Sequence, residues 1–79
     1  MEVNGYTIEP GANLRRADLR RADLRRADLK GVSLADANLY LANLEGANLE
    51  GANLEGVKAD EDTTWPQGFD PKAAGVIFE

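Results

Sequence analysis

Short polar side chains recur at every fifth position of the chain, and their oxygens could bind a cation. They are Asp18, Asp23, Asp28, Asn38, Asn43, Asn48 and Asn53. Carboxylate and amide oxygens are ligands that calcium accepts. However, the Gly-Gly-X-Gly-X-Asp pattern of calcium-binding solenoids is absent, and successive side chains are expected on different faces. We therefore expect no metal site, and we assign these residues a structural role in bonding backbone groups at turns.

The chain has few residues that could carry out catalysis. Its 79 residues contain no His, no Cys and a single Ser, Ser33, which has no base near it in the sequence. Each carboxylate is accounted for by a turn or by the surface, and nothing predicts a nucleophile with its base. The absence of Cys also excludes a disulfide framework and a thiolate metal site. We predict that the protein is not an enzyme and holds no cofactor.

A basic cluster raises the question of nucleic-acid binding. Six arginines fall between residues 15 and 26, namely Arg15, Arg16, Arg20, Arg21, Arg25 and Arg26. Three consecutive units occupy three different faces, so these side chains form a collar and no continuous stripe. Residues 1–34 carry a net charge of +2 and residues 35–79 a net charge of −7, which makes the molecule a dipole. We do not expect nucleic acid as a partner.

The elements that position these residues are defined by leucines at every fifth position. These are Leu14, Leu19, Leu24, Leu29, Leu34, Leu39, Leu44, Leu49 and Leu54, and an Ala or Val stands two residues before each. On an α-helix a step of five residues rotates about 140°, so the leucines could not form one buried stripe. A chain that extends briefly and turns every five residues places them all on the axis of a solenoid, as the structural core.

The units read Ala-(Asp/Asn)-Leu-X-X, as in residues 17–21 and 52–56, and the chain closely resembles the pentapeptide-repeat family. The resemblance implies an all-β fold, a right-handed quadrilateral parallel β-helix. With four units and about twenty residues in each coil, the array would form about 2.5 coils. It implies no particular function, because a repeat fold serves many partners.

We expect a single domain, residues 1–79, in three parts. A short N-terminal cap covers 1–11, the repeats cover 12–60, and a C-terminal cap covers 61–79. The repeat register is expected to be lost at Thr64. Within the aromatic C-terminal cap, Asp70–Gly75 predicts one helical turn and 76–78 a short strand. The segment 64–71 also resembles the ends of bacterial pentapeptide arrays.

Two further expectations concern the cellular location of the protein and the stacking of its coils. The chain opens with no basic and apolar leader, and no stretch is long enough to span a membrane, so we expect a cytoplasmic protein. A twenty-residue offset would place opposite charges over one another on successive coils, pairing Arg25 with Glu45, Lys30 with Glu50 and Arg16 with Asp36. It would also place Arg20 over Tyr40 in a cation–π contact.

Two functions remain open. The first is a rigid scaffold or protein-interaction module whose partner is unknown and could be a second copy in a homodimer. The alternative is an acidic DNA mimic that binds DNA gyrase or another DNA-binding protein, which the family resemblance suggests. The candidate contact is Tyr40-Leu41, an apolar outward pair that either meets a partner or is covered by Trp65 or Phe69. We expect Trp65, Phe69 and Phe78 to cap the column, with ligand binding as the other interpretation.

Overall fold

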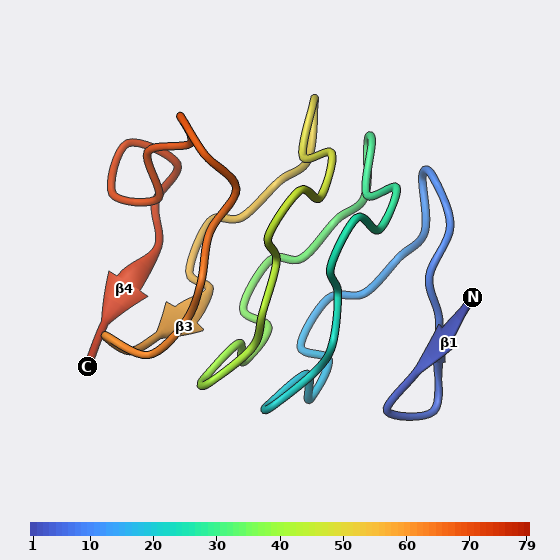
Figure 1. Ribbon diagram of the computed structural model, residues 1–79, viewed down its shortest axis with the longest axis horizontal. Helices are drawn as coiled ribbons and strands as arrows, with labels where there is room; N and C mark the ends of the chain where they lie inside the picture. Colours follow the sequence, from blue (N-terminus) through green and yellow to red (C-terminus); the bar gives the residue numbers. More distant parts are fainter.

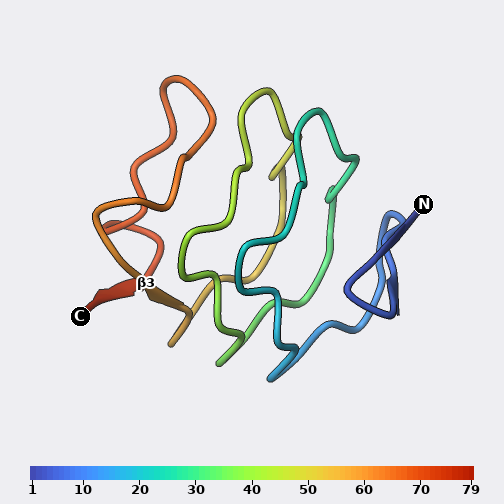
Figure 2. The ribbon, with the colours of Figure 1, turned by 60° about the horizontal axis from the view of Figure 1, so that its bottom comes forward.

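The chain folds into a short stack of coils, and a computed structural model describes all residues from 1 to 79. Successive coils lie side by side along the longest dimension, and the two termini lie at opposite ends (Figures 1 and 2). The molecule measures 26 × 21 × 20 Å. It contains no helix, and its named strands are β1 (Glu2–Val3), β2 (Tyr6–Thr7), β3 (Lys58–Ala59) and β4 (Ile77–Phe78).

Between the ends, the coils are joined by isolated parallel bridges between residues twenty positions apart. The bridges are Asn13↔Ser33, Asp18↔Asn38, Asp23↔Asn43, Asp28↔Asn48, Ser33↔Asn53 and Asn38↔Lys58. Each is made by two hydrogen bonds: the Leu24 N–H donates to the Asn43 carbonyl, for example, and the Asn43 N–H donates to the Ala22 carbonyl. One residue of each unit pairs in this way. The ladder therefore runs along the stack, and the fold is a strand-built solenoid.

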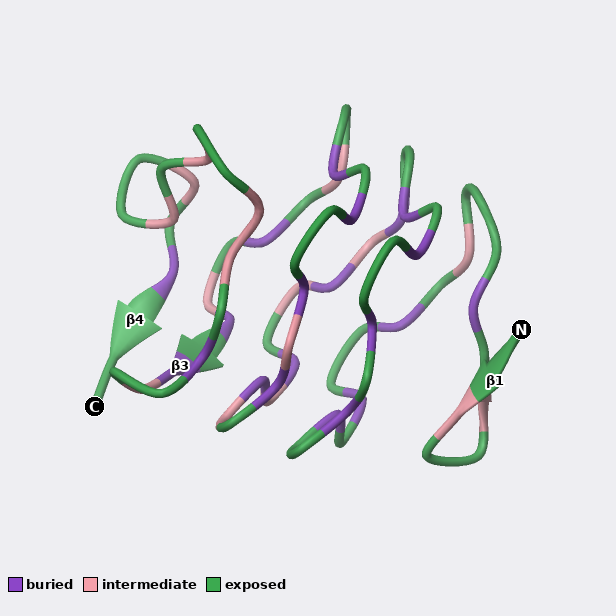
Figure 3. Ribbon diagram, in the orientation of Figure 1, coloured by how far each residue is buried: buried purple, intermediate pink, exposed green.

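The inward positions form one apolar column. All nine array leucines are at most 8% exposed, and the six from Leu19 to Leu44 are fully buried. The Ala or Val two residues before each leucine is also buried, except at Ala12 and Ala52. Buried and exposed residues accordingly alternate along every coil (Figure 3). A column this narrow accepts one branched side chain and one small group per unit, because larger groups would overpack it.

Each corner is held by the polar side chain that precedes it. The carboxylate or amide oxygens of eight units accept the backbone N–H two residues ahead, at 2.9 to 3.3 Å. The last residue of the unit then turns the chain with a positive φ. Five units use a non-glycine residue at this strained position, with φ between 60° and 62°: Arg16, Arg21, Arg26, Asp36 and Leu41. The Asp and Asn side chains that recur every five residues are therefore used in hydrogen bonds that hold the turns.

At the N-terminus, a β-hairpin covers part of the first coil. β1 and β2 pair antiparallel through a two-residue turn, Asn4-Gly5, and both turn residues have positive φ. The Tyr6 hydroxyl accepts the Asp18 N–H, and the Asn4 amide donates to the Arg20 carbonyl. Ile8 is buried in the core, as an inward residue. The segment that the sequence predicted as a short N-terminal cap therefore begins with a hairpin, because Asn-Gly favours this turn.

At the end of the array, the register continues, contrary to the expected loss at Thr64. Thr64 bridges Asn43, an offset of twenty-one residues in place of twenty. A turn beginning at Asp60 absorbs the extra residue, since the Thr63 N–H donates to the Asp60 carbonyl. The Thr63 side chain takes the buried position of an alanine, and its hydroxyl donates to the Leu39 carbonyl at 2.8 Å. The shift therefore buries the Thr63 side chain with its hydroxyl paired.

The last ten residues return to the stack without a helix. Residues 71–75 form consecutive turns, and the Val76 N–H donates to the Pro71 carbonyl. The sequence predicted one helical turn over residues 70–75. Asp70 does cap them, accepting the Ala73 N–H. Gly75 then reverses the chain at φ 91°, too soon for a helix to propagate beyond its costly first turn. β4 follows and pairs in parallel with β3.

Candidate functional site

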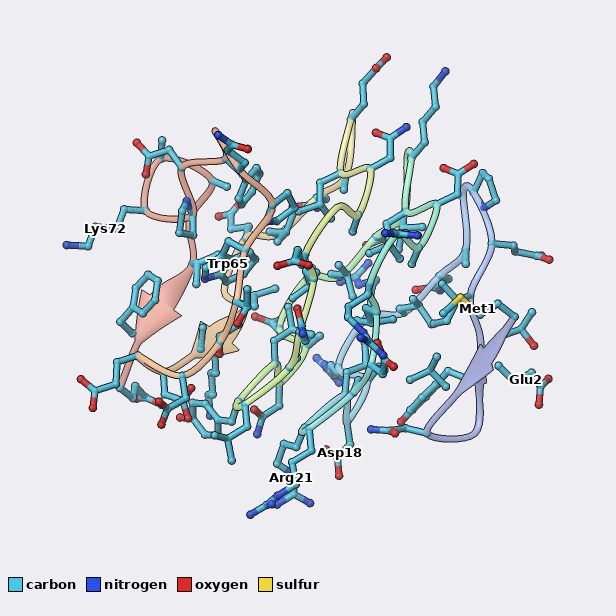
Figure 4. The ribbon with its side chains drawn as sticks, in the orientation of Figure 1. Met1, Glu2, Asp18, Arg21, Trp65 and Lys72 are labelled. Atoms are coloured by element: carbon cyan, nitrogen blue, oxygen red, sulfur yellow. The ribbon has the colours of Figure 1, made fainter.

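The most unusual surface feature is one corner of the stack, which we call the Tyr40 corner. It consists of the outward pairs of three successive coils: Arg20-Arg21, Tyr40-Leu41 and Asp60-Glu61. The twenty-residue register places these pairs along one edge of the molecule. Along that edge the side chains change from basic to apolar to acidic. In Figure 4, Arg21 projects from the body into solvent at this corner.

Tyr40 is the more enclosed member of the apolar pair. It is half-buried, its N–H donates to Asn38 Oδ1 at 3.0 Å, and its hydroxyl donates to Glu79 Oε1 at 2.7 Å. The hydrogen bond to the Glu79 carboxylate, together with partial desolvation, raises the pKa of the Tyr40 hydroxyl. The C-terminal residue thus reaches this corner through a polar contact.

Leu41 is left open at the same corner. Its side chain is 40% exposed, and its φ of 61° lies in the left-handed region. Its N–H donates to Asp60 Oδ1 at 3.3 Å, which fixes the backbone and leaves the side chain free. Beside it lies a groove of about 510 Å³, lined by Asp18, Arg20, Arg21, Tyr40, Leu41 and Asp60. Neither Trp65 nor Phe69 lines this groove.

Two of the six arginines of the first coil pair with an aspartate of their own unit. Arg20 donates through Nε and Nη2 to both carboxylate oxygens of Asp18, each at 2.8 Å, and Arg25 holds Asp23 in the same way. These hydrogen bonds lower the pKa of both aspartates to about 2. All four side chains are exposed, so screening by water keeps the energetic value of the pairs small.

The contacts expected between coils are absent, and at Arg20 and Arg25 the local pairing takes their place. No ion pair joins Arg25 to Glu45, Lys30 to Glu50 or Arg16 to Asp36, and the only two ion pairs are those within the units. Arg20 is held by Asp18 and does not stack on Tyr40. The carboxylate two residues earlier already points to the same side of the turn, so the guanidinium reaches it without crossing to the next coil. Coil register is therefore fixed by the backbone ladder.

The aromatic residues of the C-terminal segment gather at the end of the core. Trp65 and Phe69 stack with their ring centroids 5.5 Å apart and an interplanar angle of 27°. Both are half-buried and pack against the apolar column, and Trp65 Nε1 is enclosed without a hydrogen-bond partner. Figure 4 shows Trp65 at the C-terminal end of the stack. Phe78 is 40% exposed on β4. With its one-residue shift, Trp65 stands where a leucine stands in the preceding coil.

Three other features bear on metal binding, nucleic-acid binding and membrane insertion. No group of three or more carboxylates converges as a metal site. Arg15, Arg16, Arg21 and Arg26 form no ion pair, but they project from three different corners of the first coil. No helix that could cross a bilayer is present.

Comparisons with known proteins agree with the repeat geometry. A family model described as pentapeptide repeats matches the chain in eight copies, over residues 10–34 and 22–58. The crystal structure of a pentapeptide-repeat protein from the cyanobacterium Cyanothece 51142 is 43% identical, with a TM-score of 0.70. That alignment covers 71% of this chain and 38% of the other, so the present chain spans less than half the length of that relative.

A second pentapeptide-repeat structure, from Nostoc PCC 7120, is 32% identical with a TM-score of 0.49, and the alignment covers 86% of this chain and 77% of that one. A comparison with curated proteins finds no match. The family match spans the units whose leucines form the buried column. The chain therefore belongs to the pentapeptide-repeat family.

Proposed function

We propose that this protein is a non-enzymatic, rigid β-helical module that binds another protein through the Tyr40 corner. We also propose that its coils follow the right-handed, four-sided path that the family resemblance implies. In such a solenoid the interior is filled with side chains, so binding takes place on the outer edges and faces. A binding site is then expected at an outer edge whose side chains are not explained by the stability of the fold.

Leu41 is the single observation that supports this site. A non-glycine residue in the left-handed region costs about 1–2 kcal/mol. Gly31, Gly46, Gly51 and Gly56 occupy the same position of other units without that cost. Leu41 shares this cost with four charged residues, Arg16, Arg21, Arg26 and Asp36, and is the one apolar residue among the five. It leaves 40% of its surface in water, which does not stabilise the coil and favours a contact made outside the molecule.

The partner we favour is a second copy of this chain. The Tyr40 corner runs from basic through apolar to acidic residues, and this order complements itself when reversed. A two-fold axis through Leu41, perpendicular to the stack, would set Arg20-Arg21 of each copy against Asp60-Glu61 of the other. The two Leu41 side chains would meet at the centre. The edge is small, so the dimer should be weak and sensitive to salt.

Sedimentation velocity over a concentration series tests this proposal. The parent protein should dimerise at about 0.05 M salt and dissociate substantially at about 0.5 M, because the flanking charge pairs are exposed. The double variant Tyr40→Ala with Leu41→Ser should be monomeric at both salt concentrations. The variant Ile77→Ser serves as a matched control, since Ile77 is also exposed and apolar but lies on β4. A parent that is monomeric at every concentration would overturn the homodimer.

The second candidate, an acidic DNA mimic, is favoured by the net charge of −7 over residues 35–79. Its difficulty is size, since the longest dimension is 26 Å and one turn of DNA spans about 34 Å. The mimic predicts inhibition or protection of gyrase supercoiling that survives the double variant and disappears when the C-terminal acids are neutralised. We expect no such effect, and clear inhibition at low micromolar protein would reverse the ranking.

A further inference from the structure

The backbone ladder has a gap at the C-terminal end of the stack. Seven of the nine array leucines, from Leu14 to Leu44, donate their N–H to a carbonyl of the next layer. The N–H groups of Leu49 and Leu54 donate to nothing, and the carbonyls of Ala47 and Ala52 accept nothing. Unpaired backbone groups along such an edge are a template for another strand. The edge formed by residues 47–54 is here called the open edge.

The gap is limited to the open edge, because C-terminal segments pair with the last coil on either side of it. Thr64 pairs with Asn43, and Ile77 pairs with Lys58, so two faces of the last coil are covered. The chain between them, residues 66–75, forms turns and makes no ladder bond with the open edge. In Figure 1 this segment forms a separate lobe beside the last coil. The layer that would follow the last coil is therefore incomplete beside the open edge. The missing strand would be about one or two five-residue units long.

The core is correspondingly less protected below the gap. Ala47 and Leu49 are 7% and 8% exposed, whereas Leu29, one coil earlier, is fully buried. A groove of about 300 Å³ lies between the open edge and the loop that carries Phe69; it is lined by Ala47, Asn48, Leu49, Glu50, Pro66, Gln67, Gly68 and Phe69. The groove thus offers backbone donors, backbone acceptors and an apolar floor together.

We infer that the open edge is a strand-addition site for an extended peptide segment of a partner protein, running parallel to residues 47–49. One peptide residue would donate its N–H to the Ala47 carbonyl and accept the Leu49 N–H, as Asn48 does with Ala27 and Leu29 one coil earlier. The residues on either side of it would turn small or branched apolar side chains into the groove. This site is separate from the Tyr40 corner and does not depend on it.

The surroundings define the occupant further. Glu45, Glu50 and Glu55 flank the open edge and form no ion pair, so a peptide with Lys or Arg beside its apolar residues is complementary in charge. A second copy fits poorly, although its first coil also has an unpaired edge. Thr64 and Ile77 already occupy the neighbouring faces of the layer, and a complete coil could not lie flat on the remaining gap. A single strand can.

Amide hydrogen exchange and chemical-shift mapping test the inference with a defined probe. The probe is a synthetic peptide with the order Lys-Ala-Asn-Leu-Lys, blocked at both ends. In the free protein, the Leu49 and Leu54 amides should exchange at least about tenfold faster than those of Leu29 and Leu34, which are paired. On addition of the peptide, the Leu49 amide should shift and become protected.

Three controls make the result specific. The same peptide methylated on the Asn backbone nitrogen cannot donate to the Ala47 carbonyl and should not bind. Glu50→Lys should weaken binding about two- to fivefold, whereas Glu9→Lys, at an exposed acid in the N-terminal cap, should leave it unchanged. The double variant at the Tyr40 corner should bind the peptide normally, so failure of the homodimer and failure of this site are distinguishable.

Several outcomes would overturn the inference. Slow exchange of the Leu49 amide in the free protein at low concentration would mean that the group is already paired. Equal binding of the methylated peptide would exclude ladder pairing as the mode of contact. Protection of Leu49 that rises with protein concentration in the absence of peptide would identify a second copy as the occupant. No shift at millimolar peptide would remove the site.

Discussion

At the scale of single residues, the aspartates of the first coil combine two roles. One oxygen of Asp18 and of Asp23 accepts the backbone N–H of the turn, and both oxygens hold an arginine. The pKa of each is lowered to about 2, below the unfolded value of about 3.9. Their contribution to stability is therefore complete above about pH 4 and is lost as the pH falls toward 2.

The variant Asp18→Asn with Asp23→Asn separates the two roles. Asparagine holds the same turn position at Asn38 and Asn43, so the fold should be kept at neutral pH. Because the variant lacks the two depressed pKa values, its melting temperature should fall less than that of the parent between about pH 5 and pH 2. Thermal melts followed by circular dichroism measure this. Parallel acid dependence of the two proteins would show that the ion pairs do not contribute.

At the scale of structural elements, the insertion at the end of the array shows how the coil tolerates an extra residue. The turn from Asp60 to Thr63 absorbs it, and the Thr63 hydroxyl both donates to the Leu39 carbonyl and accepts the Asp60 N–H. A buried polar side chain is acceptable here because its hydrogen bonds are made inside the protein. As a result, Thr64 joins the backbone ladder by pairing with Asn43, and Trp65 packs against the apolar column.

Thr63→Val should destabilise the protein by about 1–3 kcal/mol. Valine has nearly the same shape but cannot accept the Asp60 N–H, and it removes one of the two hydrogen bonds at the Leu39 carbonyl, which keeps only the Ala42 N–H. Urea unfolding measures the difference. Thr64→Val is the matched control, because the Thr64 side chain is exposed and only its backbone pairs, and it should change the free energy of unfolding by less than about 0.5 kcal/mol. Equal effects of the two substitutions would contradict the assigned role of Thr63.

Sequence reasoning reached the family and the strand-built solenoid because nine leucines at one spacing exclude other periods. It failed where a local interaction competes with the repeat. Asn4-Gly5 is a hairpin signal, which the sequence analysis did not use when it described residues 1–11 only as a cap. The shift at Thr63 could not be seen, since a threonine in an alanine position needs a partner from another coil. The expected ion pair between Arg25 and Glu45 was wrong because Asp23, two residues away, holds the guanidinium. The exposure of Leu41 depends on where the C-terminal residues return.

At the scale of the whole molecule, stability is concentrated in one column that is slightly less covered at its C-terminal end. Leu34 lies in the middle of this column and is fully buried, whereas Leu49 is 8% exposed beneath the open edge. A leucine with neighbours above and below leaves a closed cavity when it is truncated. One at the end leaves a space that water and the nearby loop can enter.

Leu34→Ala should therefore cost about 2–5 kcal/mol, enough to unfold so small a domain. Leu49→Ala should cost less, because its site is already partly open and can relax. The free energies of unfolding in urea, measured for both variants and the parent, give the comparison. If Leu34→Ala melted within a degree or two of the parent, the column of leucines would not be the main source of stability.

The twenty-residue stacking has a consequence for how such proteins diversify. The interior repeats with every unit, but the surface repeats only with every fourth unit. If replication slippage duplicated one unit, every leucine would still face inward, yet all later units would advance by a quarter of a coil. Arg21 would then no longer lie beside Leu41, and every edge would acquire a new order of side chains. A single duplication would thus rearrange the whole surface without a mutation in the core.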